Sequence, residues 1–188
     1  MNTVKVASIV ALSSLCLEAH PHENGMPVAI HAITAQGVGD DVGTLSFKDT
    51  AYGLLVTPDL HGLSAGAHAL HLHEFPDCGP KPAAEGAVPG GAAGDHYDPA
   101  QKKAHRGPYA DGHLGDLPNI IVEADGTSSI PVIAPRLKVA DVRGHAVMLH
   151  AGADRYSDED AKHQHHAQAA PGASKGGARM YCGVSGKL

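Results

Sequence analysis

The sequence predicts an all-β fold, an antiparallel β-barrel or sandwich of eight strands with two long functional loops. Composition is the first indication, because 23 glycines and 13 prolines among 188 residues favour turns and irregular loops over helices. Periodicity is the second, because apolar residues recur mostly at every second position after residue 26. Several short strands without a helical period are typical of an antiparallel sandwich or barrel.

The first segment, residues 1–19, indicates a signal peptide. Lys5 precedes the apolar run "VASIVALSSLCL", and residues 17–19 form an acceptable cleavage site. The run is too short to cross a bilayer as a stable helix, so we expect no stable membrane insertion. The exact cleavage site and lipidation of Cys16 stay open, although Leu15 is bulky for a lipoprotein signal. An export signal places the mature protein in an oxidising compartment.

The remaining chain alternates strands with turns and contains two interruptions. Residues 75–118 and 151–177 contain no convincing strand, and loops of this length inside a compact domain are usually functional or disordered. The second interruption is polar and predicts a lid or a mobile loop. The first contains residues that could hold it in place, namely Cys78, His96, His105, His113 and Asp116. The predicted strands are, in chain order, 26–35, 42–49, 51–58, 68–75, 119–126, 128–135, 144–150 and 178–185.

Charge and histidine content narrow the class of function. The formal net charge is −6 and no basic stripe is visible, so we expect no nucleic-acid partner. Fifteen histidines in 188 residues are far above ordinary usage. The composition therefore directs attention to metal binding.

Three cysteines allow one structural cross-link in the mature chain. Cys16 leaves with the signal peptide, and Cys78 and Cys182 remain. Two cysteines in an exported domain most simply form one disulfide, which in the chain-entropy model stabilises a loop of about 100 residues by about 4 to 5 kcal/mol. The alternative is two free buried thiols.

The segment "HALHLHEF" carries a pair of histidines on one face of a predicted strand. Side chains two residues apart share a face, so His71 and His73 project together, opposite Leu70 and Leu72. His68 shares the leucine face. Two imidazoles on a rigid strand are half of a copper or zinc site, although many surface pairs of this kind bind nothing.

The first long loop supplies a second set of ligands. His96, His105 and His113 are followed by Asp116, and three imidazoles with one carboxylate form a closed four-coordinate set typical of structural zinc. His145 and His150 have opposite parity in the strand 144–150, so they face opposite ways.

Five motifs in order resemble a copper/zinc superoxide dismutase of the bacterial exported type. They are "HALHLHE", "GDHYDP", "HRGPYADGHLGDLP", "GHAVMLHAGAD" and "GGARMYCGV". The resemblance runs from about residue 27 to 186 and implies a Greek-key barrel. It divides the chain into the signal peptide, a histidine-containing tail at 20–26 and a dismutase domain at 27–188.

The resemblance assigns a role to each matching residue. Each subunit holds one copper ion and one zinc ion, and His96 bridges them as an imidazolate. It also implies that Asp154 accepts hydrogen bonds from one copper ligand and one zinc ligand, His71 and His105. It further implies that Cys78 pairs with Cys182 and that Arg179 stands beside the open copper position. His68 and His145 match histidines with structural roles. The copper ligands are His71, His73, His96 and His150, and the zinc ligands are His96, His105, His113 and Asp116.

The activity that the resemblance implies is disproportionation of superoxide to oxygen and hydrogen peroxide in the periplasm. Copper would cycle between Cu(II) and Cu(I), with His96 and Arg179 as the catalytic residues. A metal-binding protein without dismutation and a purely structural sandwich are the rival interpretations, but no ligand and no arginine of the motifs is missing. The resemblance leaves monomer or homodimer open, together with the source of superoxide.

Several positions depart from the family pattern. Ala69 and Asp95 stand where glycines are usual. Two roles stay open for five further histidines: capture of copper or zinc, or no more than a solvated, weakly binding tract. These histidines are His20, His22, His163, His165 and His166.

Overall fold

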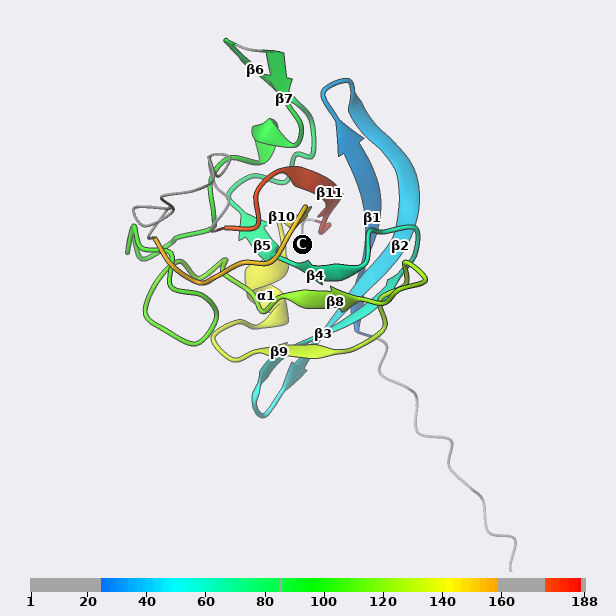
Figure 1. The fold of residues 1–188 in the computed structure, drawn as a ribbon. Coiled ribbons are helices and arrows are strands. Elements are labelled where there is room, and N and C mark those ends of the chain that lie inside the picture. Colours follow the sequence, from blue (N-terminus) through cyan, green and yellow to red (C-terminus); the bar gives the residue numbers. More distant parts are fainter. Residues whose placement is uncertain (1–24, 85, 159–174, 187–188) are drawn as a thin grey trace, which may run out of the picture.

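The computed structural model describes residues 25–84, 86–158 and 175–186, and it is dominated by antiparallel strands (Figure 1). Within these residues the helical segments are one turn of α-helix, α1 (Val139–Val142), and one 3₁₀ turn, η1 (Gly91–Ala93). The strands are β1 (Met26–Thr34), β2 (Gly37–Thr50), β3 (Gly53–Leu60), β4 (Gly66–His68), β5 (Leu70–His73), β6 (Lys81–Ala83), β7 (Gly86–Val88), β8 (Ile120–Val122), β9 (Val132–Ala134), β10 (Ala146–His150) and β11 (Arg179–Val184).

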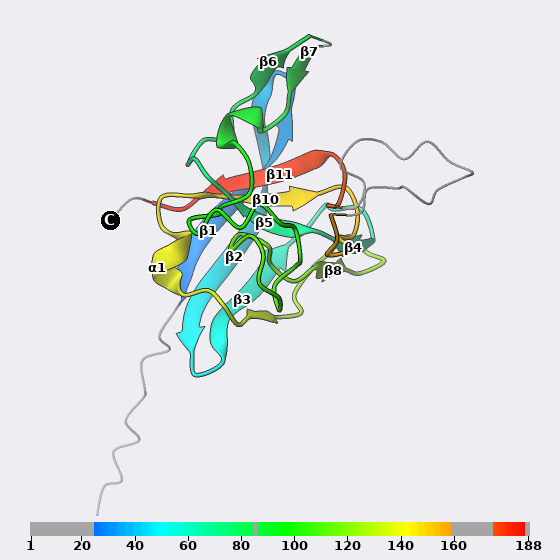
Figure 2. The same ribbon diagram turned by 90° about the vertical axis from the view of Figure 1, so that its left-hand side faces the viewer.

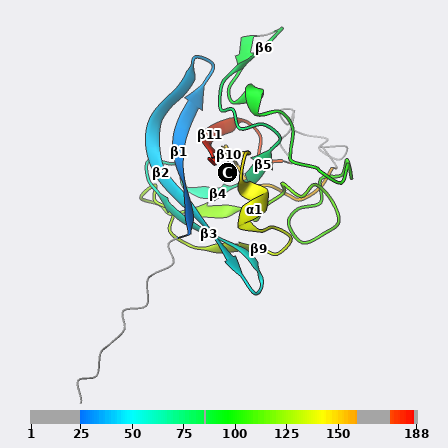
Figure 3. The ribbon, with the colours of Figure 1, turned by 180° about the vertical axis from the view of Figure 1, so that it is seen from behind.

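Strand pairing produces a curled sheet whose two edges approach each other. The main sheet has the order β5-β10-β11-β1-β2-β3-β9, while β4 pairs with β8. Only Ala69 separates β4 from β5, and Leu60 at the end of β3 bridges to Ser128 between β8 and β9. The chain therefore crosses over from β3 to β4 and from β9 to β10, and the antiparallel all-β class that the sequence predicts is confirmed (Figure 3).

The core is mainly aliphatic, with Phe47 as its fully buried aromatic side chain among the described residues. Leu45, Phe47, Leu70 and Leu72 are fully buried in one large cluster in the middle of the curled sheet. A smaller cluster surrounds the disulfide and includes Met148. Burial of the leucines on one face of β5 directs the histidines between them to the opposite face.

The strand count differs from the expectation in two places. Every predicted segment contains a strand, but the segment 68–75 is divided at Ala69 into β4 and β5, which pair with different neighbours. The expectation that residues 75–118 contain no strand was wrong, because β6 and β7 form a short hairpin. Its residues "KPA" and "GAV" are too short and too exposed to produce an alternating pattern.

The irregular segments between η1 and β8 lie together on one side of the sheet, across from β1 and β2 (Figures 1 and 2). In the same views the β6–β7 hairpin projects from the body of the molecule. The predicted signal peptide, residues 20–24 of the tail, Cys16, His163, His165 and His166 all lie outside the described residues. No helix in the part of the chain that the structure describes is long and apolar enough to cross a membrane.

Candidate metal centre

Strand β5 presents the first two candidate ligands. His71 and His73 are fully buried, and their ring centroids are 6.3 Å apart. Strand β10 is paired with β5 in the main sheet, and its last residue is His150, whose ring centroid lies 4.7 Å from that of His71. Two adjacent strands therefore hold three imidazoles in one place.

The long loop runs beside β5 and adds the remaining candidates. His73 forms an isolated β-bridge with His96, and His71 forms one with Asp116. Backbone hydrogen bonds fix this approach, since Leu72 donates to Gly115 over 2.9 Å and accepts from Tyr97 over 2.9 Å. Main-chain pairing of the loop with β5 thus determines where its ligands lie.

The candidate ligand atoms form two groups that share residues. In each group one ring nitrogen or carboxylate oxygen per residue lies within 4.8 Å of all the others. His96 belongs to both groups, and so does His71. The first group is His71, His73, His96 and His150, and the second is His71, His96, His105 and Asp116.

The carboxylate of Asp116 is the centre of the second group. Its Oδ1 lies 2.8 Å from Nδ1 of His96, 3.0 Å from Nδ1 of His105 and 3.4 Å from Nδ1 of His113. His113 therefore approaches the same oxygen but stands slightly outside the tighter group. The other oxygen of Asp116 accepts from the backbone amides of Arg106 and Gly107, each over 3.2 Å, so the carboxylate orders the loop around it.

Asp154 joins the two groups through one carboxylate. Its Oδ2 accepts from Nε2 of His71 and its Oδ1 from Nε2 of His105, both over 2.7 Å. Asn119 in turn holds the backbone of Asp154 with two amide hydrogen bonds, of 2.9 and 3.0 Å. A carboxylate held in this way fixes which ring nitrogen of each histidine carries the proton.

Five of the candidate ligands each have one buried ring nitrogen without a hydrogen-bond partner. His71 donates from Nε2 to Asp154, while His73 and His150 donate from Nδ1 to the carbonyl oxygens of Gly94 and Gly177 over 3.0 and 2.9 Å. Unpaired buried polar atoms are costly, so a group of them indicates a missing metal partner. The buried ring nitrogens without a hydrogen-bond partner are Nδ1 of His71, Nε2 of His73, Nδ1 of His105, Nδ1 of His113 and Nε2 of His150.

The pKa shifts of the buried histidines run in opposite directions at the two ends of the site. Burial, together with the neighbouring imidazoles, lowers the pKa of His71 and His73 well below the usual range, and lowers that of His150 to about 4. For His105 burial also lowers the pKa, but hydrogen bonds with Asp116 and Asp154 outweigh it and raise the pKa to about 9. Neutral imidazoles suit a transition metal, and a carboxylate with imidazoles suits zinc.

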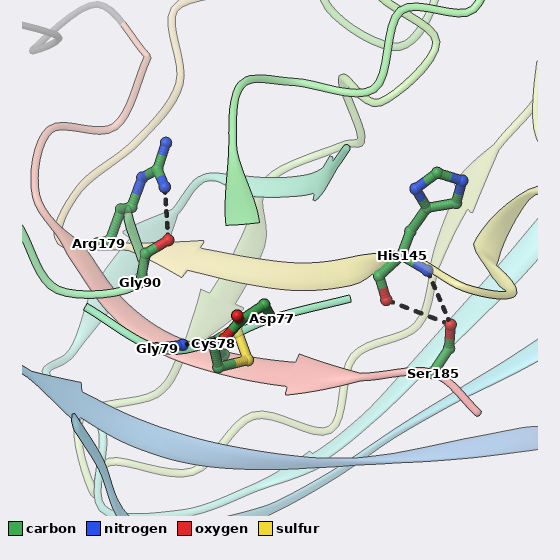
Figure 4. The surroundings of a disulfide bond; sticks show 8 residues. Asp77, Cys78, Gly79, Gly90, His145, Arg179 and Ser185 are labelled. Carbon is green, nitrogen blue, oxygen red and sulfur yellow. Dashed lines mark hydrogen bonds between the residues drawn. A yellow bond between two sulfur atoms is a disulfide. The ribbon is translucent and has the colours of Figure 1, made fainter. Parts of the chain in front are cut away.

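Arg179 stands at the edge of the first group. Its guanidinium donates to the carbonyl oxygen of Gly90 over 2.6 Å (Figure 4). It also donates to the carbonyl oxygen of Gly94 over 2.7 Å. These carbonyls belong to the segment that the disulfide between Cys78 and Cys182 ties to β11, and this pairing confirms the expected cross-link. The arginine is thus held beside His73 and His150.

The site opens into a pocket of about 770 Å³. Its cationic groups are Lys103, Lys175 and Arg179, and the ligands that reach it are His73, His96, His113 and His150. Its carboxylates are Glu74, Asp95, Asp98 and Asp158. Cations and carboxylates are nearly balanced, so the lining alone does not give the pocket a strong positive field.

Two other predicted histidines lie away from the ligand groups. Both ring nitrogens of His68 contact carbonyl oxygens, those of His150 and Ser64, each at 2.7 Å. His145 directs Nδ1 at the carbonyls of His73 and Glu74 and packs against Tyr97. Their contacts link strands and loops.

Sequence reasoning missed the residues that hold the ligands in place. Asn119 fixes Asp154, Asp158 accepts the backbone amide of His105 over 2.8 Å, and Arg136 binds the loop before Asp116. These residues act mostly on backbone atoms, which leave no spacing pattern in a sequence. No periodicity would have identified them.

Comparisons with known proteins agree on one family. A family model described as copper/zinc superoxide dismutase (SODC) matches residues 42–185. The chain is 40% identical to "Superoxide dismutase [Cu-Zn]" of Neisseria meningitidis, over 98% of each chain. Among solved structures, the copper/zinc superoxide dismutase from Brucella abortus aligns with a TM-score of 0.76 at 38% identity, covering 85% of this chain and 97% of that one. The monomeric enzyme from Salmonella enterica aligns with a TM-score of 0.69 at 40% identity, covering 84% and 97%.

Proposed function

Because the chain belongs to the copper/zinc superoxide dismutase family, we propose how its residues divide the work of that enzyme. The protein is an oxidoreductase that converts two superoxide ions and two protons to oxygen and hydrogen peroxide, with copper and zinc as cofactors. What remains to be assigned is the ligand set of each metal and the role of each neighbouring side chain.

The copper ligands are His71, His73, His96 and His150. The observation that carries this assignment is the set of unpaired buried nitrogens on three of these rings, each left by a hydrogen bond on the opposite nitrogen. Imidazole nitrogens of this kind suit copper.

The zinc ligands are His96, His105, His113 and Asp116, whose ring nitrogens converge on one carboxylate oxygen. His96 directs Nδ1 at Asp116, so its other ring nitrogen remains for the copper group. His71 belongs to the copper side despite its closeness to the second group, because its Nε2 is used by Asp154.

Bound copper supplies the one-electron redox chemistry, and zinc supplies a fixed positive charge without redox change. The chain's own residues bind the substrate and transfer the protons that the reaction needs. Nδ1 of His96 faces Asp116 and would be occupied by zinc, so the opposite nitrogen is the one that takes up a proton in one half of the cycle and gives it to reduced substrate in the other. The second proton enters from solvent through the open pocket.

Arg179 binds the anionic substrate. It is held at Gly90 and Gly94, within a pocket lined by three copper ligands, and it is one of three cations there. Superoxide dismutase is itself a standard illustration of electrostatic steering, in which a local positive field raises the rate of encounter with an anion. Lys175 contributes less to the field, since its Nζ lies 3.7 Å from a carboxylate oxygen of Asp158.

The protein works in the periplasm after removal of residues 1–19, with residues 27–188 as the catalytic domain. Support comes from the apolar run after Lys5 and from the disulfide, because disulfides persist in oxidising compartments. Export is tested by fractionating cells that produce the full chain and locating the processed form.

The oligomeric state is either a homodimer or a monomer, and the similar enzyme from Salmonella enterica is a monomer. Sedimentation of the mature, metal-loaded chain over a range of concentrations decides between them.

A dismutase assay on the mature chain reconstituted with copper and zinc tests the proposed function. We expect activity that a copper chelator abolishes and that added copper restores. A metal-loaded chain without dismutase activity would instead identify a copper-binding protein.

A further inference from the structure

The side chain of Arg136 donates hydrogen bonds to four backbone carbonyl oxygens of the segment that contains the proposed zinc ligand His113. Its guanidinium donates hydrogen bonds to carbonyl oxygens at both ends of the segment 107–113. The bonds run from Nε to Pro108 over 3.0 Å, from Nη1 to Gly112 over 3.1 Å, and from Nη2 to Gly107 over 3.1 Å and to His113 over 2.5 Å.

The segment has little other structure of its own. Among the described residues, its backbone hydrogen bonds outside strands are Gly112 to Ala110 over 3.0 Å, His113 to Ala104 over 2.8 Å and Asp116 to His113 over 3.5 Å. Four carbonyl oxygens that converge on one point repel one another unless a cation lies between them. The positive guanidinium offsets that repulsion and holds the two ends of the segment 107–113 close to each other.

The backbone on both sides of Arg136 is anchored in the core, while Arg136 itself is partly buried. Arg136 follows β9, and its neighbours Ala134 and Leu137 are each 1% exposed. A planar guanidinium with five fixed donors can serve several carbonyls at once, whereas a lysine ammonium cannot hold them in the same plane. The segment is therefore attached to the core of the barrel through one residue.

Arg136 and Asp116 hold the same residues from opposite sides. Gly107 donates its amide to Asp116 and presents its carbonyl to Arg136. His113 approaches Asp116 with Nδ1 and also presents its carbonyl to Arg136. A displacement of the guanidinium would therefore move a ligand nitrogen relative to the carboxylate.

We infer that Arg136 is a positioning residue for zinc, which holds His113 and the preceding segment against Asp116 and thereby slows zinc release. The inference rests on the proposed zinc ligand set. Removal of a residue that orients metal ligands without touching the metal typically lowers affinity by about 10 to 100-fold.

The test compares Arg136→Lys and Arg136→Gln with the wild-type mature chain. Each protein is loaded with copper and zinc, and release of each metal is followed with a chromogenic chelator. We expect zinc release to accelerate about tenfold or more in both variants, with copper release changed by less than about twofold. In the derivatives with cobalt in the zinc site, the visible absorption bands of both variants should shift.

Arg143 provides the matched control. It follows α1, and its side chain forms no hydrogen bond among the residues that the structure describes. Arg143→Lys and Arg143→Gln should release zinc at the wild-type rate and leave the cobalt bands unchanged.

Zinc release from the Arg136 variants within about twofold of wild type would overturn the inference. Loss of both metals to the same extent would also overturn it, because a purely structural role has that result. If Arg136→Gln does not fold, Arg136→Lys decides, since it retains the positive charge.

A His113→Gln variant separates this inference from the ligand assignment. If it binds zinc as tightly as wild type, the ligand set is wrong. If it loses zinc while the Arg136 variants retain it, the ligand set stands and the role of Arg136 fails.

Discussion

Arg179 and His73 donate hydrogen bonds to the same carbonyl oxygen, that of Gly94, over 2.7 and 3.0 Å. The residue proposed to bind substrate and a proposed copper ligand are thus positioned by one backbone atom. Gly94 has φ of 78°, and a Cβ there would lie 2.7 Å from Oε2 of Glu74 and 2.8 Å from the ring of Phe75. This close approach explains why a glycine occupies the position.

Replacement of Arg179 by Ala should slow turnover while both metals remain bound. The variant loses the positive charge beside the copper group, so we expect kcat/KM to fall by about tenfold or more and its dependence on ionic strength to flatten. Stopped-flow kinetics at several salt concentrations, with metal content measured in parallel, provide the test. Arg179→Lys is the charge-conserving control, and unchanged kinetics in Arg179→Ala would contradict the substrate-binding role.

Asp116→Asn should weaken zinc far more than copper. The change removes an anionic ligand on which three imidazole nitrogens converge. Three of the four copper ligands, His71, His73 and His150, keep hydrogen bonds that do not involve Asp116. Competition with a chelator should show zinc affinity lower by about 10 to 100-fold. Equal loss of copper and zinc would count against the assignment.

Asp154→Asn should affect both metals. Asp154 accepts from His71 on one side and from His105 on the other, and an amide offers only one acceptor oxygen. We expect both affinities to fall by about tenfold or more, because one ligand of each metal loses its orienting partner. Selective loss of a single metal would show that Asp154 does not link the two sites.

Removal of the disulfide should lower stability and disturb Arg179. Cys78 and Cys182 are 104 residues apart in sequence, so the chain-entropy model predicts a free energy of unfolding lower by about 4.7 kcal/mol in the double serine variant. Denaturant titration measures this loss. The carbonyls that anchor Arg179 lie in the segment that the disulfide holds, so kcat/KM should fall as well, and an unchanged value would show that the segment holds its position unaided.

Removal of both metals should destabilise the fold. Metal that binds only the native state contributes about 4 kcal/mol at a free concentration roughly 1,000 times its Kd, and its loss leaves buried ring nitrogens unpaired. Calorimetry of the metal-free and reloaded chain should show a lower midpoint without metal that is restored by zinc and copper. Identical midpoints would contradict the native-state site.

Part of the site could be predicted from local pattern. The period of two placed His71 and His73 on one face and Leu70 and Leu72 on the other, and the leucines are indeed in the core. The cysteine count led to the disulfide. The ligands from the long loop had no such period. Their residue types alone suggested a zinc set, and the family resemblance of their motifs then divided the ligands between two metals.

The sequence by itself determined the all-β class, the histidine face of β5 and the pair of cysteines, because alternation and cysteine count are local properties of the chain. Only the tertiary structure decided that Asn119 holds the backbone of Asp154 and that Arg136 gathers the carbonyls around His113. Those contacts involve backbone atoms and residues far apart in the chain. A backbone carbonyl is the same at every position, so which ones meet depends on how the barrel folds the loop back onto itself.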